Sequence, residues 1–300
     1  MSAVPQKAFV AYTGRDATLA RLIATGVAKA NARNRTMRYT PWEFNDIAGV
    51  PLTSPILAEI QGSTFMVADI THLNPNVVYE IGFAIGTGKR SFLVKWRNVE
   101  GDRRIAQAAG IFDTLGYEEY EDDDELAHRL SSYIDPTPQP IPAGLDRLAP
   151  VYIVEPPEKN GIATLMTSRL KKARYRYRRF DPGEESRLSA VDAIRQVAVS
   201  SGVLVSLLKD DNDQGQVHNV RSLFVAGLAD GMGKPSLLLA HNSLNVPLDV
   251  RDDTKRFGFP ADITEHIAAF SLEVTDYLQQ ADPSPLRATN PLQALSVGDP

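Results

Sequence analysis

Apolar positions in the first 134 residues alternate between short continuous runs and stretches with helical spacing. The continuous runs predict buried strands, and the stretches in which apolar residues recur every three or four positions predict helices. The predicted strands are 8–12, 37–44, 64–70, 91–96 and 116–120, and the predicted helices are 17–30, 54–61, 76–87 and 123–134. Strands that alternate with helices are typical of a parallel sheet covered on both faces.

The same pattern begins again after a proline-rich segment. Residues 135–142 contain four prolines, which predicts a semi-rigid linker over 135–150. The strands predicted beyond it are 151–154, 174–180, 203–208 and 236–240, and the helices are 162–172, 186–200, 220–231 and 263–279. From residue 281 onward no periodicity remains, which predicts a disordered tail over 281–300. We therefore expect two tandem α/β domains, over residues 1–134 and 151–280.

A repeat relates the two halves, and in it glycines coincide while acidic residues do not. Aligning Gly88-Lys89 with Gly233-Lys234 gives an offset of 145 residues. The small residues that then coincide are Gly82 with Gly227, Ala84 with Ala229, and Gly86 with Gly231. Glu80 falls on Val225, or on Leu223 if the Asn-Val pairs are aligned instead, and Asp69 falls near Leu207. A repeat that keeps its packing glycines and loses its carboxylates predicts one working site and one inactive copy.

The two carboxylates lie where a ligand crevice is expected. Asn74 and Pro75 predict a helix start, because Asn caps helices and Pro favours the first helical position. Asp69 ends the preceding strand, and Glu80 lies at the margin of the helix's apolar stripe. Strand ends and helix starts line the crevice of a parallel sheet, so both side chains are expected to face it. The alternative is that Glu80 interacts with the helix dipole and that Asp69 caps a loop.

Composition excludes several other classes of function. The chain is 43% hydrophobic and carries a net charge of −5, which gives no basic field for nucleic acid or for an anionic membrane. It has no cysteine, so disulfides, thiolate metal sites and cysteine nucleophiles are excluded, and its five histidines lack metal-ligand spacing. No apolar run approaches the roughly 18 residues of a membrane span. A cytoplasmic protein without a metal or another cofactor is expected.

The segment from Asp69 to Lys89, with its Asn-Val-x-x-Glu-x-Gly-x-Ala pattern ending at Ala84, resembles the nucleoside 2-deoxyribosyltransferase signature. It is also similar to bacterial TIR-like nucleotide-binding domains, which share a flavodoxin-like core, and the resemblance covers roughly residues 8–134. In the transferases the matching glutamate attacks the anomeric carbon, and in TIR-type enzymes it supports cleavage of the nicotinamide–ribose bond of NAD. The resemblance implies that Glu80 is the nucleophile or the oxocarbenium stabiliser, and that Asp69 orients the sugar or the base.

Two further segments, 9–16 and 39–42, resemble the opening strand and the second strand of a TIR domain. The resemblance implies that Tyr12, Arg15 and Trp42 border the pocket, with Arg15 available for a phosphate and an aromatic ring for a base. Each of them has the alternative of being an ordinary loop or core residue. His72 and Asn76, in the polar loop 71–76 and at its end, complete the candidate substrate contacts. That loop is longer than in a typical deoxyribosyltransferase.

These patterns lead to one principal hypothesis and two alternatives. The fold expected is two tandem flavodoxin-like domains. The function expected is an N-glycosidase that cleaves, or transfers across, the base–ribose bond of NAD or another nucleotide, with the second domain as a degenerate copy. The resemblance suggests a bacterial stress or antiphage effector that works as a homo-oligomer or with a partner protein. The alternatives are a non-catalytic nucleotide-sensing module and a pure interaction scaffold.

Overall fold

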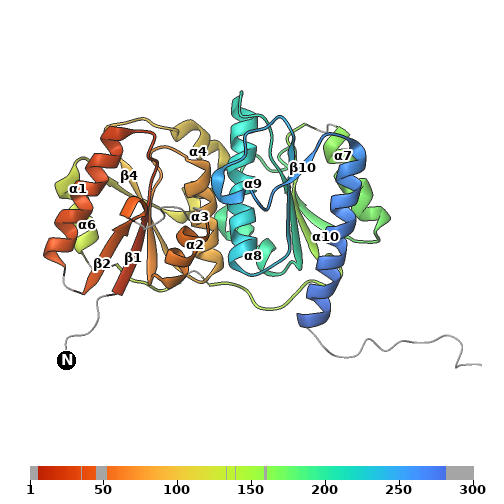
Figure 1. The fold of residues 1–300 in the computed structure, drawn as a ribbon, viewed down its shortest axis with the longest axis horizontal. Coiled ribbons are helices and arrows are strands. Elements are labelled where there is room, and N and C mark those ends of the chain that lie inside the picture. Colours follow the sequence, from red (N-terminus) through yellow and green to blue (C-terminus); the bar gives the residue numbers. More distant parts are fainter. Residues whose placement is uncertain are drawn as a thin grey trace, which may run out of the picture.

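Two parallel sheets stand side by side in the computed structural model, which describes residues 6–34, 36–44, 53–132, 134–138, 140–158 and 161–281 (Figure 1). The strands of the first sheet are β1 (Gln6–Ala11), β2 (Met37–Pro41), β3 (Phe65–Asp69), β4 (Ser91–Trp96) and β5 (Glu118–Tyr120). Their order is β2-β1-β3-β4-β5, and all pairs are parallel. Every residue of the central strand β3 is buried, as expected for a strand covered by helices on both faces.

The second sheet repeats this topology. Its strands are β6 (Val151–Val154), β7 (Tyr177–Phe180), β8 (Gly202–Ser206), β9 (Ser236–His241) and β10 (Lys255–Phe257). Their order is β10-β9-β8-β6-β7, which is the order of the first sheet written from its other edge. The predicted fold class, two tandem flavodoxin-like domains, is therefore confirmed. The sequence pattern missed β10, because this strand has three residues and buries only Phe257.

Helices of the first domain cover its sheet on two faces. They are α1 (Ala17–Arg33), α2 (Thr53–Gly62), α3 (Pro75–Gly86), α4 (Arg103–Ala109), α5 (Ile111–Leu115) and α6 (Asp123–Ser131), with a short 3-10 helix η1 (Trp42–Phe44). Helices α1 and α6 pack on the outer face, and α2 to α5 pack on the face toward the second domain. The short helices α4 and α5 were not predicted from the sequence.

Helices of the second domain are arranged in the same way. They are α7 (Gly161–Lys172), α8 (Ala190–Ala198), α9 (Asp213–Gly231) and α10 (Pro260–Ala281), with a 3-10 helix η2 (Leu248–Val250). Helices α7 and α10 cover the outer face, and α8 and α9 face the first domain. Helix α9 begins seven residues before the predicted position 220, since Asn212 caps it by accepting from Gly215 N at 2.8 Å.

The segments outside these elements complete the comparison with the sequence. The described residues of the predicted linker 135–150 form neither helix nor strand, and the predicted tail from residue 282 onward lies outside the described residues. Among the described residues, no helix combines the length with the apolar character that a membrane crossing requires.

Helices α3 and α9 lie side by side at the centre of the molecule and share one hydrophobic core that spans both domains. A Cβ atom on Gly82 would lie 2.2 Å from the carbonyl oxygen of Phe224, and one on Gly227 would lie 2.1 Å from that of Tyr79. Gly86 and Gly231 approach the opposite helix in the same way. The contacts are reciprocal at an offset of 145 residues, so the two domains are related by a pseudo-two-fold axis. The repeated glycines are the points where the two backbones touch.

Candidate functional site

A hollow of about 530 Å³ lies at the carboxyl end of the first sheet. The residues that line it are Thr13, Arg15, Asp16, Ala17, His72, Leu73, Asn74 and Asp102. They come from the segments after β1, β3 and β4, and the connections of the sheet change direction between β1 and β3. Ligands of open parallel sheets bind at this switch point. The Asn74 amide donates to Thr13 Oγ1 at 3.3 Å, so the two loops hold one another.

The hollow gathers two of the candidate residues, Arg15 and His72. Arg15 is exposed and makes no ion pair with another described residue. His72 Nε2 lies 3.4 Å from Asp16 Oδ2. Asp16 also caps α1 by accepting from Thr18 N and Leu19 N, and these backbone hydrogen bonds, that from Leu19 first, lower the pKa of Asp16. The Asp16 carboxylate therefore occupies the start of α1, and Arg15 is the group in the wall of the hollow that suits an anionic ligand.

Asp69 does not reach the hollow. Its side chain is 1% exposed and accepts from Thr71 N at 2.9 Å, from Thr71 Oγ1 at 3.1 Å and from the Tyr120 hydroxyl at 2.6 Å. Burial raises the pKa of Asp69 to about 6. Thr71 Oγ1 in turn accepts from Trp96 N at 2.8 Å. Asp69 thus joins the ends of β3, β4 and β5, which is a structural arrangement.

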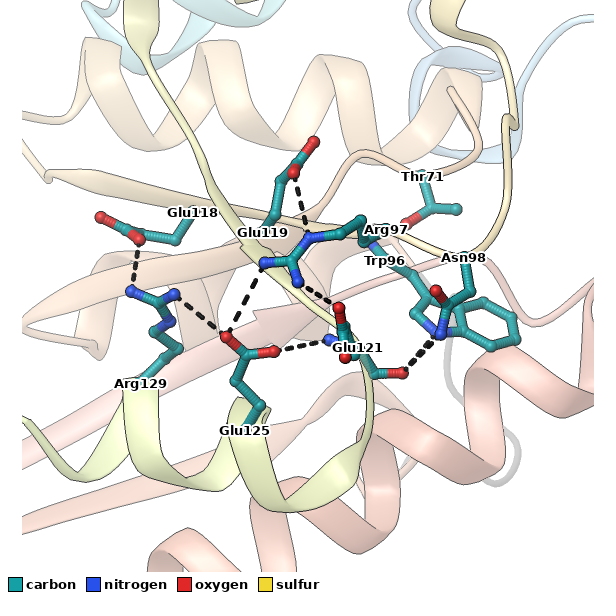
Figure 2. A network of polar contacts seen from close by, with 9 residues as sticks. All are labelled: Thr71, Trp96, Arg97, Asn98, Glu118, Glu119, Glu121, Glu125 and Arg129. Atoms are coloured by element: carbon teal, nitrogen blue, oxygen red, sulfur yellow. Dashed lines mark hydrogen bonds and ion pairs between the residues drawn. The ribbon is translucent and has the colours of Figure 1, made fainter.

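Next to this junction lies a surface network that accounts for the acidic run 118–125. Figure 2 shows Arg97 between Glu119, Glu121 and Glu125, and Arg129 between Glu118 and Glu125. Each of these side chains is at least a quarter exposed, so the pairs contribute little stability individually. Together they connect the end of β4, the strand β5 and the first turns of α6.

Glu80 lies at the contact between the domains. It is 5% exposed and faces Asp249 of η2, which is 2% exposed. Burial, and then the neighbouring Asp249 carboxylate, raise the pKa of Glu80 well above its usual range. Burial also raises the pKa of Asp249, and the interaction with Glu80 offsets part of that rise. Neither Asp249 oxygen accepts from an N–H or hydroxyl group of a described residue. Burial and the repulsion between the two carboxyl groups therefore favour the protonated form of Glu80.

The expectation that Asp69 and Glu80 line one crevice is corrected by this geometry, because the lining of the hollow includes neither side chain. Glu80 lies six residues beyond Asn74, or about 9 Å along α3. It points to the side of α3 that the second domain covers. The pattern of apolar residues reports on packing within each domain, so it could not reveal that the second domain packs over this side of α3.

Tyr12, Trp42 and Asn76 surround the hollow rather than line it. The rings of Tyr12 and Trp42 lie 6.2 Å apart at an angle of 58°. The Trp42 Nε1–H group is buried and has no acceptor among the described residues. Asn76 Oδ1 accepts from the backbone N–H of Asp249 at 3.4 Å, so Asn76 belongs with the Glu80–Asp249 pair.

The corresponding edge of the second sheet is filled by its own side chains. The strand registers place Ser206 at the position of Asp69, in place of Leu207, because the offset of the repeat is smaller in this strand than in the helix. His218, from the additional turns of α9, is buried with Nε2 2.9 Å from Ser206 O, and burial lowers its pKa to about 4. Asn219 pairs with the backbone of Leu208 through two hydrogen bonds of 2.8 Å. This edge supports the interpretation of the second domain as an inactive copy.

Val225 occupies the position of Glu80 in that copy, and it is fully buried. We expect Val225→Gln to destabilise the fold by about 1–3 kcal/mol, because its amide would be buried without partners. Urea denaturation measures the change in the free energy of unfolding. An unchanged denaturation midpoint would show that this position tolerates a polar group.

No protein-family model matches the chain, and no curated protein has a matching sequence. Among the described residues, no group of three or more His, Asp or Glu side chains is arranged to hold a metal ion. The site must therefore be interpreted from its own geometry.

The sequence did not point to Asp249, since it lies in a short turn of the other domain and no motif marks it. The sequence also did not point to Asp102 as a residue of the hollow. Its Oδ2 accepts from Leu73 N, a residue that only the folded chain brings close to it.

Proposed function

We propose that the first domain binds a nucleotide at the switch-point hollow and that Glu80 serves in breaking the base–ribose bond. The observation that carries this proposal is the buried carboxyl pair Glu80–Asp249, in which Glu80 belongs to the helix that Asn74 of the hollow caps. Strongly shifted carboxyl groups at the edge of a cavity are frequent in catalytic sites. The resemblance of residues 69–89 to the deoxyribosyltransferase signature supports the same reaction class.

The pair suits the charge that this reaction develops. Heterolysis of the base–ribose bond sends the bonding electrons to the base and leaves positive charge on the anomeric carbon. A carboxyl pair with one proton carries one negative charge in a region shielded from water, where it stabilises a nearby cation more strongly than in water. Water, or a second acceptor, then takes the sugar. Where the departing base needs a proton, the pair holds one.

The hollow suits the other end of the substrate. Arg15 provides a guanidinium group without an ion-pair partner among the described residues, and guanidinium groups bind phosphate in a bidentate manner. Trp42, which is half-buried and packs against Tyr12, provides aromatic surface near Gly14, the residue before Arg15. Glu80 lies further along α3, about 9 Å from the Asn74 end of the hollow.

Incubation with a panel of NAD, ATP and deoxynucleosides, followed by chromatography of the free bases, tests the proposal. We expect release of the base from at least one member of the panel. The burial of Glu80 against the second domain favours one alternative, a nucleotide-sensing module without catalysis. Calorimetric binding of a nucleotide that stays intact would establish that alternative in place of the glycosidase.

A further inference from the structure

The second domain reaches the functional residue of the first at one point, the turn that carries η2. We propose that Asp249 is a positioning residue for Glu80, so that the second domain acts directly on the site of the first. This inference rests on the proposed function of Glu80. It assigns to the inactive copy a role in the reaction beyond that of a scaffold.

Three contacts hold Asp249 in place. Helix η2 packs against both α3 and α2. The backbone N–H of Asp249 donates to Asn76 Oδ1, one turn before Glu80 on the same side of α3. The Asp249 carboxyl group faces that of Glu80, and both side chains are buried. The hydrogen bond from the Asp249 backbone to Asn76 holds the Asp249 carboxyl group in a defined position next to Glu80.

Asp249 is also the charged neighbour that acts on Glu80. The other ionisable side chains on the elements packed against α3 are engaged elsewhere. They are Glu59 with Lys7, Asp69 with Tyr120, Lys95 over the ring of Tyr117, Asp213 with Arg104, His218 with Ser206, Arg221 with carbonyls of 108 and 109, and Asp230 with Tyr79. Beyond η2, burial and then Asp230 raise the pKa of Asp253. Removing the charge of Asp249 should therefore change Glu80 specifically.

Asp249→Asn removes that negative charge while keeping the size of the side chain, and its amide can donate to an ionised Glu80. Both effects favour the ionised form of Glu80. If ionised Glu80 is the active form, the wild-type kcat/KM rises with pH through the raised pKa of Glu80. In the variant this rise should move to lower pH by about one unit. Asp253→Asn, on the same segment, is the matched control and should leave the profile unchanged.

A stability measurement tests the inference independently of any substrate. Because the pKa of Glu80 is raised on folding, the folded state binds the additional proton, and stability is lost as pH rises through that pKa. In Asp249→Asn the loss between mildly acidic and alkaline pH should be smaller than in the wild type. Because burial also raises the pKa of Asp249 itself, this change should exceed the one that Asp249→Asn produces in a Glu80→Gln background. Urea denaturation across this pH range provides the comparison.

The outcomes separate the two proposals. A displaced kcat/KM profile together with a flatter stability profile for Asp249→Asn supports the inference. If no nucleotide loses its base, the proposed function fails, and the stability profile alone decides whether Asp249 acts on Glu80. If Asp249→Asn matches the wild type in both profiles, or if Asp253→Asn produces the same displacement, the inference is overturned.

Discussion

Gly227→Val is expected to destabilise the protein by about 3 kcal/mol or more, because the new side chain meets backbone atoms rather than side chains that can move. A Cβ atom at this position would lie 2.1 Å from Tyr79 O and 2.9 Å from Phe83 N of the opposite helix. Helices α3 and α9 would have to separate, and their shared core would open. The denaturation midpoint in urea should fall sharply.

Gly62→Ala is the control for this experiment. Gly62 lies at the exposed end of α2, and no atom lies within 4 Å of the position that an added methyl group would take there. Alanine has the higher helix propensity, so this variant should be neutral or slightly stabilising. Equal midpoints for Gly227→Val and Gly62→Ala would contradict the close contact of the two helices.

Glu80→Gln is expected to reduce turnover by about 10²–10⁴-fold, the usual consequence of losing an electrostatic stabiliser or a nucleophile. Its effect on folding should be small at neutral pH. Burial and the Asp249 carboxylate already disfavour the ionised form of Glu80, and the glutamine amide can donate to Asp249. Turnover and thermal midpoint are measured on the same preparation. A variant with low activity and a greatly lowered midpoint would indicate a structural role for Glu80 instead.

The pH dependence of this variant has a definite sign. The raised pKa of Glu80 makes the wild type lose stability as pH rises through that pKa. Glutamine does not titrate, so the wild type should lose more stability than Glu80→Gln toward alkaline pH. Asp69, whose pKa of about 6 is also raised by burial, contributes equally to both proteins. If the free energy of unfolding of the two proteins declines equally as pH rises, a group other than Glu80 causes the decline.

Much of the fold could be predicted because its signals are local. Continuous apolar runs mark the central strands β3 and β8, and the Asn74-Pro75 pair marks the start of α3. The repeat of glycines predicted that the halves share a topology. The three-residue strand β10 and the short helices α4 and α5 have too few residues to establish a period.

The site could be predicted only in part, because its arrangement depends on contacts between distant residues. The repeat singled out Glu80, and the glycine alignment at 145 residues placed Val225 opposite it. It did not reveal that Asp249 meets Glu80 across the domain contact, at a separation of 169 residues in the chain. It also placed Asp69 in the crevice, whereas the hydroxyl groups of Thr71 and Tyr120 hold it in the interior.

The central claim is that the first domain breaks a base–ribose bond with Glu80. Its most direct test is chromatographic measurement of free base over time, with the wild type and Glu80→Gln incubated in parallel with NAD, ATP and deoxynucleosides. We predict base release that is proportional to the wild-type concentration for at least one nucleotide and is at least about 100-fold slower with Glu80→Gln. Equal rates for the two proteins, or intact nucleotides in every incubation, would contradict the claim.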